Sequence, residues 1–331
     1  VAIVPWNAQL FLSATKIAPA LAAGNTVVVK ASEQAPAALF KLAELVDMAG
    51  FPPGVINIIT GFGEPCGRII TSHPKVARVA FTGGCDVAKH IVKNTAENFA
   101  HVSLELGGKS PIIIFDDCDI EGAINGIIAG NFGASGQSCV AGSRVFIQEN
   151  IFNKVVSELK ERAKNIVIGD PLDKKTQIGP LATSAQVDRA YNVITNSVKQ
   201  GAKLIFGGQS PKHLAEGWYF EPTLLTCPHQ NIDSVKIELF APVISAVSFN
   251  TEDDAIQMAN DSDFGLGAGI FTENLARGHR VSQKIHSGIV WINTYRAISP
   301  LSPFGGFKLS GGSREAGMDA IHEYTRTKTT W

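Results

Sequence analysis

The chain of 331 residues has little of several features that mark particular classes of protein. Its formal net charge is −1 and it contains no block of like charge, so nothing indicates nucleic acid or an anionic membrane as a partner. It also lacks a charged leader with a cleavage site and an apolar run of the roughly 18 residues that span a bilayer. We therefore expect a soluble, cytoplasmic protein.

Cysteine is scarce as well, with five residues in the chain. They are odd in number, far apart and never spaced as C-x-x-C, which argues against a zinc site, a redox pair or a disulfide scaffold, and we expect no metal. A single cysteine is most often a small, partly buried hydrophobic residue. The five are Cys66, Cys85, Cys118, Cys139 and Cys227.

What the chain does contain is apolar sequence, 45% of its residues against 18% charged ones, which is ample for a large core. Apolar strand-like runs alternate with helical stretches, the pattern of parallel sheets covered by helices on both faces. Strands are expected at 25–30, 55–60, 77–83, 101–107, 110–115, 143–148, 204–208, 242–249, 267–271 and 288–293, and helices at 36–50, 86–97, 120–132 and 151–165. This order predicts an α/β fold of two domains with open, mostly parallel sheets.

Ligands in such sheets bind beyond the carboxyl ends of the strands, where loops lead into helices. Chemically capable residues follow four of the expected ends: Lys30 with Glu33, the Gly83–Gly84 turn, Glu105 and Asn7. A solvated face for the Lys30–Glu33 pair and a plain turn for the two glycines are the alternative interpretations. Glu105 is harder to dismiss, because a carboxylate between two leucines of a strand is costly to hold unless something uses it.

Cys139 differs from the other cysteines in its surroundings. It lies in the stretch GASGQSCVAGSR, residues 133–144, where glycine, alanine and serine surround one thiol. This concentration of small residues around one thiol raises the question of what use the chain makes of it.

Eight motifs identify the chain as similar to the aldehyde dehydrogenase family over practically its whole length, from Pro5 to about Lys328. They occur in the family's order: PWN (5–7), KASE (30–33), FTGG (81–84), LELGGKSP (104–111), GQSCVAGSR (136–144), ELFAPV (238–243), PFGGFKLSG (303–311) and SREAG (313–317). The resemblance implies a cofactor-binding domain at 1–109, a catalytic domain at 110–309, and a return to the cofactor domain at 310–331 with the start of an oligomerisation strand.

The resemblance also implies catalytic roles. Cys139 would attack the aldehyde carbonyl, with the oxyanion held by the Asn7 side chain and the Cys139 backbone N–H, and Glu105 would activate the water that hydrolyses the acyl-enzyme. Lys16, a lysine that follows the PWN motif in the family, joins these catalytic candidates. No metal is needed for this chemistry.

The implied cofactor is NAD. Lys30 and Glu33 match residues that hydrogen-bond the adenosine ribose, and a carboxylate there would repel the 2′-phosphate of NADP. Glu238 matches a residue that binds the nicotinamide ribose, and Phe240 one that packs near the nicotinamide. The remaining cofactor candidates are Gly83, Gly84, Leu106 and Gly107.

Some positions depart from the family pattern. Gly84 and Cys85 replace a serine and a threonine, which removes a hydroxyl expected at the cofactor pyrophosphate. Ala8, Gln9 and Thr15 replace bulkier residues, which predicts a wider substrate tunnel and a substrate bulkier than acetaldehyde. No partner for Arg326 is evident from the sequence.

Two other functions stay open. One is a CoA-acylating relative, which would not need Glu105, and the other is a catalytically silent member that acts as a binding protein. We also expect these residues to be part of a longer polypeptide that forms a homodimer or homotetramer, with strands near 1–4 and 325–331 exposing unpaired edges.

Overall fold

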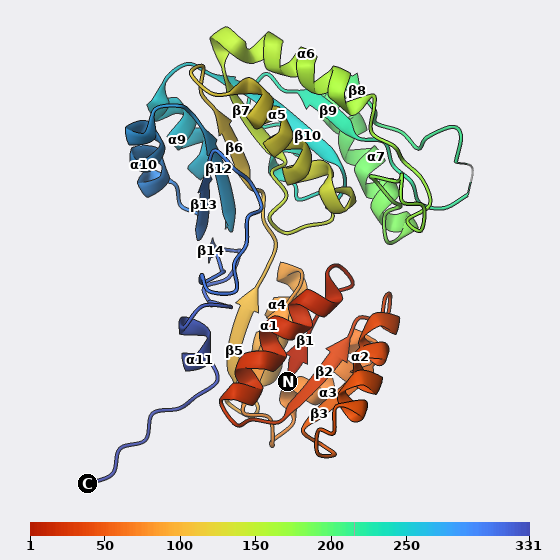
Figure 1. Cartoon of the computed structure of the whole chain (residues 1–331), viewed down its shortest axis with the longest axis vertical. Coiled ribbons are helices and arrows are strands. Elements are labelled where there is room, and N and C mark those ends of the chain that lie inside the picture. Colours follow the sequence, from red (N-terminus) through yellow and green to blue (C-terminus); the bar gives the residue numbers. More distant parts are fainter. Residues whose placement is uncertain (215) are drawn as a thin grey trace. The chain divides into compact units, whose positions relative to one another are not determined.

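The computed structural model describes residues 1–214 and 216–331, which form two compact units (Figure 1). Unit 1 consists of Val1–Gly107 together with Ile298–Trp331, and unit 2 is Gly108–Ala297. The compact units are divided at 107/108 and 297/298, whereas the sequence predicted domain boundaries at 109/110 and 309/310.

Unit 1 is built on a five-stranded sheet in the order β3-β2-β1-β4-β5, in which every adjacent pair is parallel. The strands are β1 (Ala2–Ile3), β2 (Val27–Ala31), β3 (Ile56–Thr60), β4 (Arg78–Thr82) and β5 (His101–Glu105). The helices are α1 (Gln9–Ala22), α2 (Ala37–Met48), α3 (Arg68–Ser72), α4 (Cys85–Thr95) and α11 (Asp319–His322). Val29 and Val79 are fully buried because helices cover both faces of the sheet, as β-branched parallel strands require.

The two ends of the chain differ from expectation. Strand β1 is not an edge strand: Ala2 lies opposite both Val29 of β2 and Ala80 of β4, so the prediction of an unpaired edge there was wrong. Residues 325–331 form neither helix nor strand. Arg326 has a partner after all, because its Nη2 donates to the carbonyl oxygen of Ala77 at 3.2 Å.

Unit 2 contains a seven-stranded sheet in the order β13-β12-β6-β7-β10-β9-β8, parallel except where β8 runs antiparallel to β9. The strands are β6 (Pro111–Ile114), β7 (Arg144–Gln148), β8 (Lys203–Phe206), β9 (Thr223–Thr226), β10 (Val243–Phe249), β12 (Gly267–Phe271) and β13 (Ile289–Ile292). The helices are α5 (Ile120–Ile127), α6 (Phe152–Ala163), α7 (Ser184–Lys199), α8 (Asp233–Lys236), α9 (Glu252–Asn260) and α10 (Leu275–Lys284). Two short strands, β11 (Phe264–Gly265) and β14 (Phe307–Lys308), complete the elements.

These two sheets confirm the predicted α/β fold with open, mostly parallel sheets. Strands β6 and β7 are buried on both faces, with Ile112, Val145 and their neighbours almost inaccessible. Such strands give continuous apolar runs in the sequence, which explains why they were predictable.

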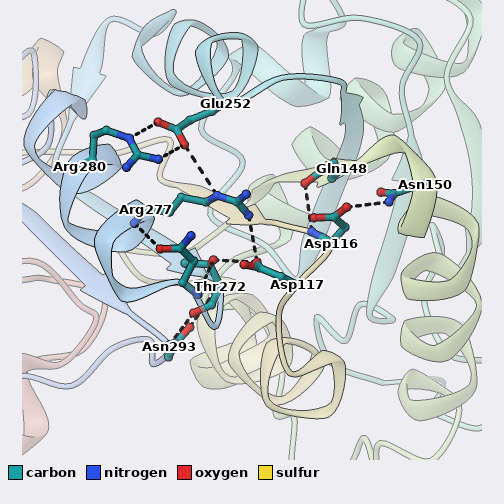
Figure 2. A network of polar contacts seen from close by, with 10 residues as sticks. Asp116, Asp117, Gln148, Asn150, Glu252, Thr272, Arg277, Arg280 and Asn293 are labelled. Carbon is teal, nitrogen blue, oxygen red and sulfur yellow. Dashed lines mark hydrogen bonds and ion pairs between the residues drawn. The ribbon is translucent and has the colours of Figure 1, made fainter.

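A polar network lies at the carboxyl ends of four neighbouring strands of unit 2, β13, β12, β6 and β7 (Figure 2). Arg277 of α10 lies 3.1 Å from Asp117 and 3.7 Å from Glu252, and its guanidinium stacks over the ring of Phe115. Thr272 Oγ1 donates to Asp117 at 2.7 Å. The network therefore ties α10 and α9 to the loops after β6 and β12.

Candidate active site

Cys139 lies at the amino end of β7, after an irregular segment that follows α5. The helix ends at Ile127 and continues as a π-helical turn over Ile128–Phe132. Three consecutive residues then have left-handed backbone conformations: Ala134 and Ser135 at φ 54° and Gly136 at φ 72°. Left-handed residues other than glycine cost roughly 1–2 kcal/mol each, so the surrounding structure must hold this turn in place.

Close packing and hydrogen bonds supply that support. A Cβ on Gly136 would lie 2.2 Å from the carbonyl carbon of Ala241, so only glycine fits. Ser135 Oγ donates to the carbonyl of Gly179 at 2.9 Å, and the buried Tyr295 hydroxyl donates to the carbonyl of Val140 at 3.0 Å. The small residues around Cys139 thus have a packing reason.

The turn before β6 touches both Cys139 and Glu238. A Cβ on Gly108 would lie 2.3 Å from the Cys139 carbonyl oxygen, and the Gly108 N–H donates to Glu238 Oε1 at 3.0 Å. Burial raises the pKa of Glu238, and this hydrogen bond opposes the rise. One glycine therefore connects the predicted nucleophile to a predicted cofactor ligand.

Arg144, the last residue of the cysteine motif, holds the turn before β6 in place by hydrogen bonds. Its guanidinium is buried and donates to the carbonyls of Lys109 at 2.7 Å, Met258 at 3.1 Å and Ala259 at 2.8 Å. The latter two carbonyls belong to the last turn of α9, whose negative dipole end favours a cation.

The accessibility of the cysteines distinguishes Cys139 from the two buried ones. Burial raises the pKa of Cys118 to about 11 and raises that of Cys227, which makes both thiols poor nucleophiles. Cys139 is partly exposed, as are Cys66 and Cys85, but Cys139 alone follows the strained turn.

In unit 1, Glu105 ends β5 and is buried, with 3% of its surface exposed. Neither carboxylate oxygen has a hydrogen-bond partner among the described residues. Burial, and secondly the charge of Glu315, raise the pKa of Glu105 well above its ordinary value. The structure thus places a buried carboxyl group without a hydrogen-bond partner, and with a raised pKa, where the sequence suggested one that is in use.

Lys16 lies beside this carboxyl group in a buried cluster. It is fully buried in α1 and donates to Thr82 Oγ1 at 2.7 Å and to Glu315 Oε1. Thr15, one of the departures from the family pattern, donates to Glu315 Oε2 at 3.1 Å. Sequence reasoning missed Glu315 as a site residue, although it stands in the SREAG motif; the signal was that a buried lysine needs a carboxylate partner.

The remaining candidates of unit 1 follow the carboxyl ends of strands, as expected. Lys30 is buried at the end of β2, and its Nζ lies 3.3 Å from Oε2 of the exposed Glu33. Gly84 precedes α4 in an extended conformation, without a side-chain cap, and a Cβ there would meet open space. A Cβ on Gly83 would lie 2.4 Å from the ring of Phe81.

Residues 310–313 hold the end of β5. The Leu106 N–H donates to the carbonyl of Ser310 at 3.0 Å, and Ser310 Oγ donates to the carbonyl of Gly107 at 2.7 Å. Asn7 is partly exposed between β1 and α1, and Phe240 has a left-handed φ of 55° in unit 2.

The candidates therefore fall into two sets. Unit 1 carries Asn7, Lys16, Lys30, Glu33, Gly83, Gly84, Glu105, Leu106 and Gly107, and unit 2 carries Cys139, Glu238 and Phe240. Their individual roles stay predictions.

A cavity of about 730 Å³ in unit 1 opens elsewhere, at the amino ends of β1, β2 and β4. Its lining includes Val1, Arg78 and Tyr324, and Lys16 alone among the candidate residues. Since Glu33 and Gly84 follow carboxyl ends of the same sheet, the cavity is not the predicted cofactor site.

Within residues 1–214 and 216–331, no group of three or more His, Cys, Asp or Glu side chains could hold a metal ion. Nor is any helix of this part of the chain long and apolar enough to cross a membrane.

Comparison with known proteins gives consistent matches over the whole chain. Residues 1–330 match the model of the aldehyde dehydrogenase family. A (Z)-2-((N-methylformamido)methylene)-5-hydroxybutyrolactone dehydrogenase from Acinetobacter baylyi is 56% identical over 331 residues, covering 100% of this chain and 67% of the relative. A betaine aldehyde dehydrogenase from Brucella anthropi is 44% identical, covering 100% of this chain and 68% of the relative.

Solved structures agree. PnpE from Pseudomonas sp. WBC-3 superposes with a TM-score of 0.96 at 40% identity, covering 98% of this chain and 67% of that one. The betaine aldehyde dehydrogenase of Staphylococcus aureus in complex with NAD+ gives a TM-score of 0.95 at 39% identity, covering 98% of this chain and 64% of that one. The chain thus spans about two thirds of the length of these relatives.

Proposed function

The chain belongs to the aldehyde dehydrogenase family, and we propose on this basis that it carries the reacting residues of an enzyme that oxidises an aldehyde to the carboxylic acid with NAD. The membership confirms the resemblance seen in the sequence, and NAD complexes among the structural neighbours support the cofactor. The observation that supports the proposal is that each unit carries one unusual feature: unit 2 has a strained turn leading to Cys139, and unit 1 has a buried Glu105 without a hydrogen-bond partner among the described residues.

In the proposed reaction the Cys139 thiolate adds to the aldehyde carbon, and the carbonyl oxygen becomes an oxyanion. The Asn7 amide and the Cys139 N–H donate to that oxygen, each such donor being worth about 10²–10³ in rate. NAD, held by Glu33 and Glu238, would supply the acceptor for the hydride that leaves the same carbon. Water activated by Glu105 then attacks the thioester, and cleavage of the carbon–sulfur bond releases the acid and regenerates the thiolate.

The raised pKa of Glu105 suits the role of general base. A base works best when its pKa is near the working pH, and an ordinary glutamate is too weak at neutral pH. Burial raises the pKa of Glu105, while the nearby Lys16 ammonium limits the rise. Glu315 fixes that ammonium, so these residues position Glu105 electrostatically rather than contact the substrate.

Two features of unit 1 support the proposal that the predicted residues bind NAD. Glu33 is exposed beside Lys30 at the carboxyl end of β2, which allows a carboxylate to accept hydrogen bonds from a ribose. The start of α4 has no side-chain cap, which leaves its first N–H groups for a pyrophosphate. The charge of Glu33 supports NAD over NADP.

The substrate is proposed to be bulkier than acetaldehyde. The resemblance to the family implies bulkier residues at the positions of Ala8, Gln9 and Thr15, and the Acinetobacter relative is named for a hydroxybutyrolactone. A 5-hydroxybutyrolactone is the ring-closed form of an aldehyde that bears a carboxyl group. Cytoplasmic location and a homo-oligomeric state remain part of the proposal.

The test uses the complete polypeptide that contains these residues. It is incubated with NAD and a panel of aldehydes, including betaine aldehyde and substituted 5-hydroxybutyrolactones, with and without CoA. NADH formation without CoA supports the proposal. Strict dependence on CoA would identify the acylating alternative, and no turnover of any aldehyde would favour the silent family member.

The Glu105→Gln variant separates the steps. The amide cannot take a proton from water, so steady-state turnover should fall by about 10²–10⁴-fold. A burst of NADH near one per site, with acylated Cys139 detected by mass spectrometry, would assign Glu105 to hydrolysis. Unchanged turnover would leave Glu105 without a catalytic role.

A further inference from the structure

Asn131 is a buried polar residue that the proposed mechanism does not use. It is the next-to-last residue of the π-helical turn Ile128–Phe132 that follows α5, eight residues before Cys139, and its side chain is fully buried. Neither the amide oxygen nor the amide nitrogen has a hydrogen-bond partner among the described residues. Leaving both groups unpaired inside a protein is costly, about 1–3 kcal/mol for each.

A small cavity is lined in part by Asn131. Its volume is about 10 Å³, and Asn131 lines it together with Glu238, Ser138 and Ser143. All of these residues belong to unit 2. A cavity of this size holds about one water molecule, and it is far too small for a nicotinamide ring.

The lining matches the needs of a bound water. Buried waters typically make about three hydrogen bonds to polar groups that otherwise lack partners. Asn131 offers one donor and one acceptor, whichever way its amide is turned, and the Glu238 carboxylate offers an acceptor. The hydroxyls of Ser138 and Ser143 complete a polar lining.

We propose that this cavity binds one water molecule that links the Asn131 amide to the Glu238 carboxylate, and that Asn131 is thereby a positioning residue for cofactor binding. The Gly108 N–H holds Glu238 Oε1 from one side, and the water holds the carboxylate from the other. This second hydrogen bond also favours the ionised carboxylate, which burial disfavours. The role in cofactor binding rests on the proposed function, in which Glu238 binds the nicotinamide ribose.

The first test is a high-resolution crystal structure of the complete polypeptide without NAD. We expect one ordered water at about 2.7–3.2 Å from both the Asn131 amide and the Glu238 carboxylate. An empty cavity, or an Asn131 amide paired directly with another protein group, would overturn the proposal. This test stands even if no aldehyde is turned over.

The second test is Asn131→Leu, which removes the amide and fills the cavity. The KM and Kd for NAD should rise about tenfold, the effect of losing about one hydrogen bond to a charged group, while kcat changes less than about twofold. Asn125→Leu is the matched control, because Asn125 is exposed on the same helix, and its NAD affinity should be unchanged.

Asn131→Ser covers the case in which the leucine variant does not fold. It keeps a hydroxyl and room for the water, so the rise in the KM for NAD should be about threefold. An unchanged KM for NAD in the folded variants, or a fall in kcat alone, would refute the link to Glu238. Absence of NAD binding by the unmutated protein would instead count against the proposed function.

Discussion

The two ends of the unit 2 sheet treat buried polar groups in opposite ways. At the carboxyl end, Arg277 faces the carboxylates of Asp117 and Glu252, and the neighbouring hydroxyls and amides are hydrogen-bonded (Figure 2). At the amino end, the Lys109 ammonium and the Asn131 amide have no hydrogen-bond partner among the described residues. The carboxyl end therefore places two carboxylates opposite its guanidinium, although Arg277 Nε and Nη1 form no hydrogen bond among the described residues, whereas the ammonium and the amide at the amino end have no hydrogen bond at all.

Backbone conformation shows the same difference. At the carboxyl end, the left-handed residue is Asn293, which tolerates φ 54° and exchanges two hydrogen bonds with the backbone of Thr272. At the amino end, alanine and serine occupy the left-handed turn before Cys139. Backbone strain often persists where function needs it, so this difference supports the proposal that the reacting thiol lies at the amino end, and we interpret the carboxyl end as a structural clamp.

The strongest test of this contrast is Cys139→Ala. Aldehyde-dependent NADH formation should fall by about 10⁴-fold or more, because no other group replaces the thiolate. Thermal unfolding should show little change, since a partly exposed sulfur is lost. The controls Cys118→Ala and Cys227→Ala should keep turnover; a similar loss in either of them would contradict the assignment.

Removing the Arg277 guanidinium should lower the stability of the protein and leave turnover nearly unchanged, the reverse of the effect expected for Cys139→Ala. In Arg277→Met, the carboxylates of Asp117 and Glu252 lose their cation, so the free energy of unfolding should fall by about 1–3 kcal/mol. Denaturant titration measures this, and kcat should stay within about twofold. Arg280→Met, at a more exposed position, should cost less than about 1 kcal/mol. A loss of turnover without a loss of stability in Arg277→Met would contradict a purely structural role for the carboxyl end of the sheet.

A substitution of Lys109 tests whether a buried ammonium without a hydrogen bond lowers the stability of the protein at the amino end of the sheet. Burial, and secondly the charge of Arg144, lower its pKa from 10.5 to about 7. The unfolded chain binds this proton more tightly, so the cost of burial is fully present below about pH 7 and disappears as the pH rises toward 10.5. Lys109→Met should therefore stabilise the protein by about 1–3 kcal/mol near neutral pH and by less at alkaline pH. Melting curves across this range measure the difference, and an equal gain at every pH would show that folding does not lower the pKa of Lys109.

The smallest expected effects come from the two left-handed residues. Ala134→Gly should stabilise by about 0.5–1 kcal/mol, because glycine adopts φ 54° without strain. Asn293→Gly should destabilise by about 1 kcal/mol, because it removes the hydrogen bonds to Thr272. The same replacement thus gives opposite signs at the two ends, and equal signs would count against the interpretation of strain.

The sequence predicted what depends on local composition. Strand β4 and helix α2 were placed within one or two residues, because an apolar run and an amphipathic repeat bounded by Pro36 and Gly50 are local signals. Helix α7, by contrast, was not predicted, although it carries a regular apolar face with Ala190, Val193 and Ile194 buried. The many polar residues of α7 conceal this apolar periodicity in the sequence.

For the site, motifs located Cys139 and Glu105, whereas partners distant in sequence were missed. Lys16 and Glu315 form an ion pair across 299 positions, and no local pattern specifies such a contact. Asn131 was missed for a different reason. Nothing in IAGNFG shows that both of its amide atoms are buried beside a cavity, since this depends on the packing of segments more than a hundred residues away.

The division of unit 1 between the two ends of the chain has a consequence for the order of folding during synthesis. Unit 2 is continuous and can fold once residue 297 has emerged from the ribosome. The surroundings of Glu105 need residues 310–315, which supply the backbone contacts to Leu106 and the carboxylate that binds Lys16. The nascent chain therefore can form the turn before Cys139 first and bury Glu105 last, so the unit that carries the thiol folds before the surroundings of this carboxyl group are complete.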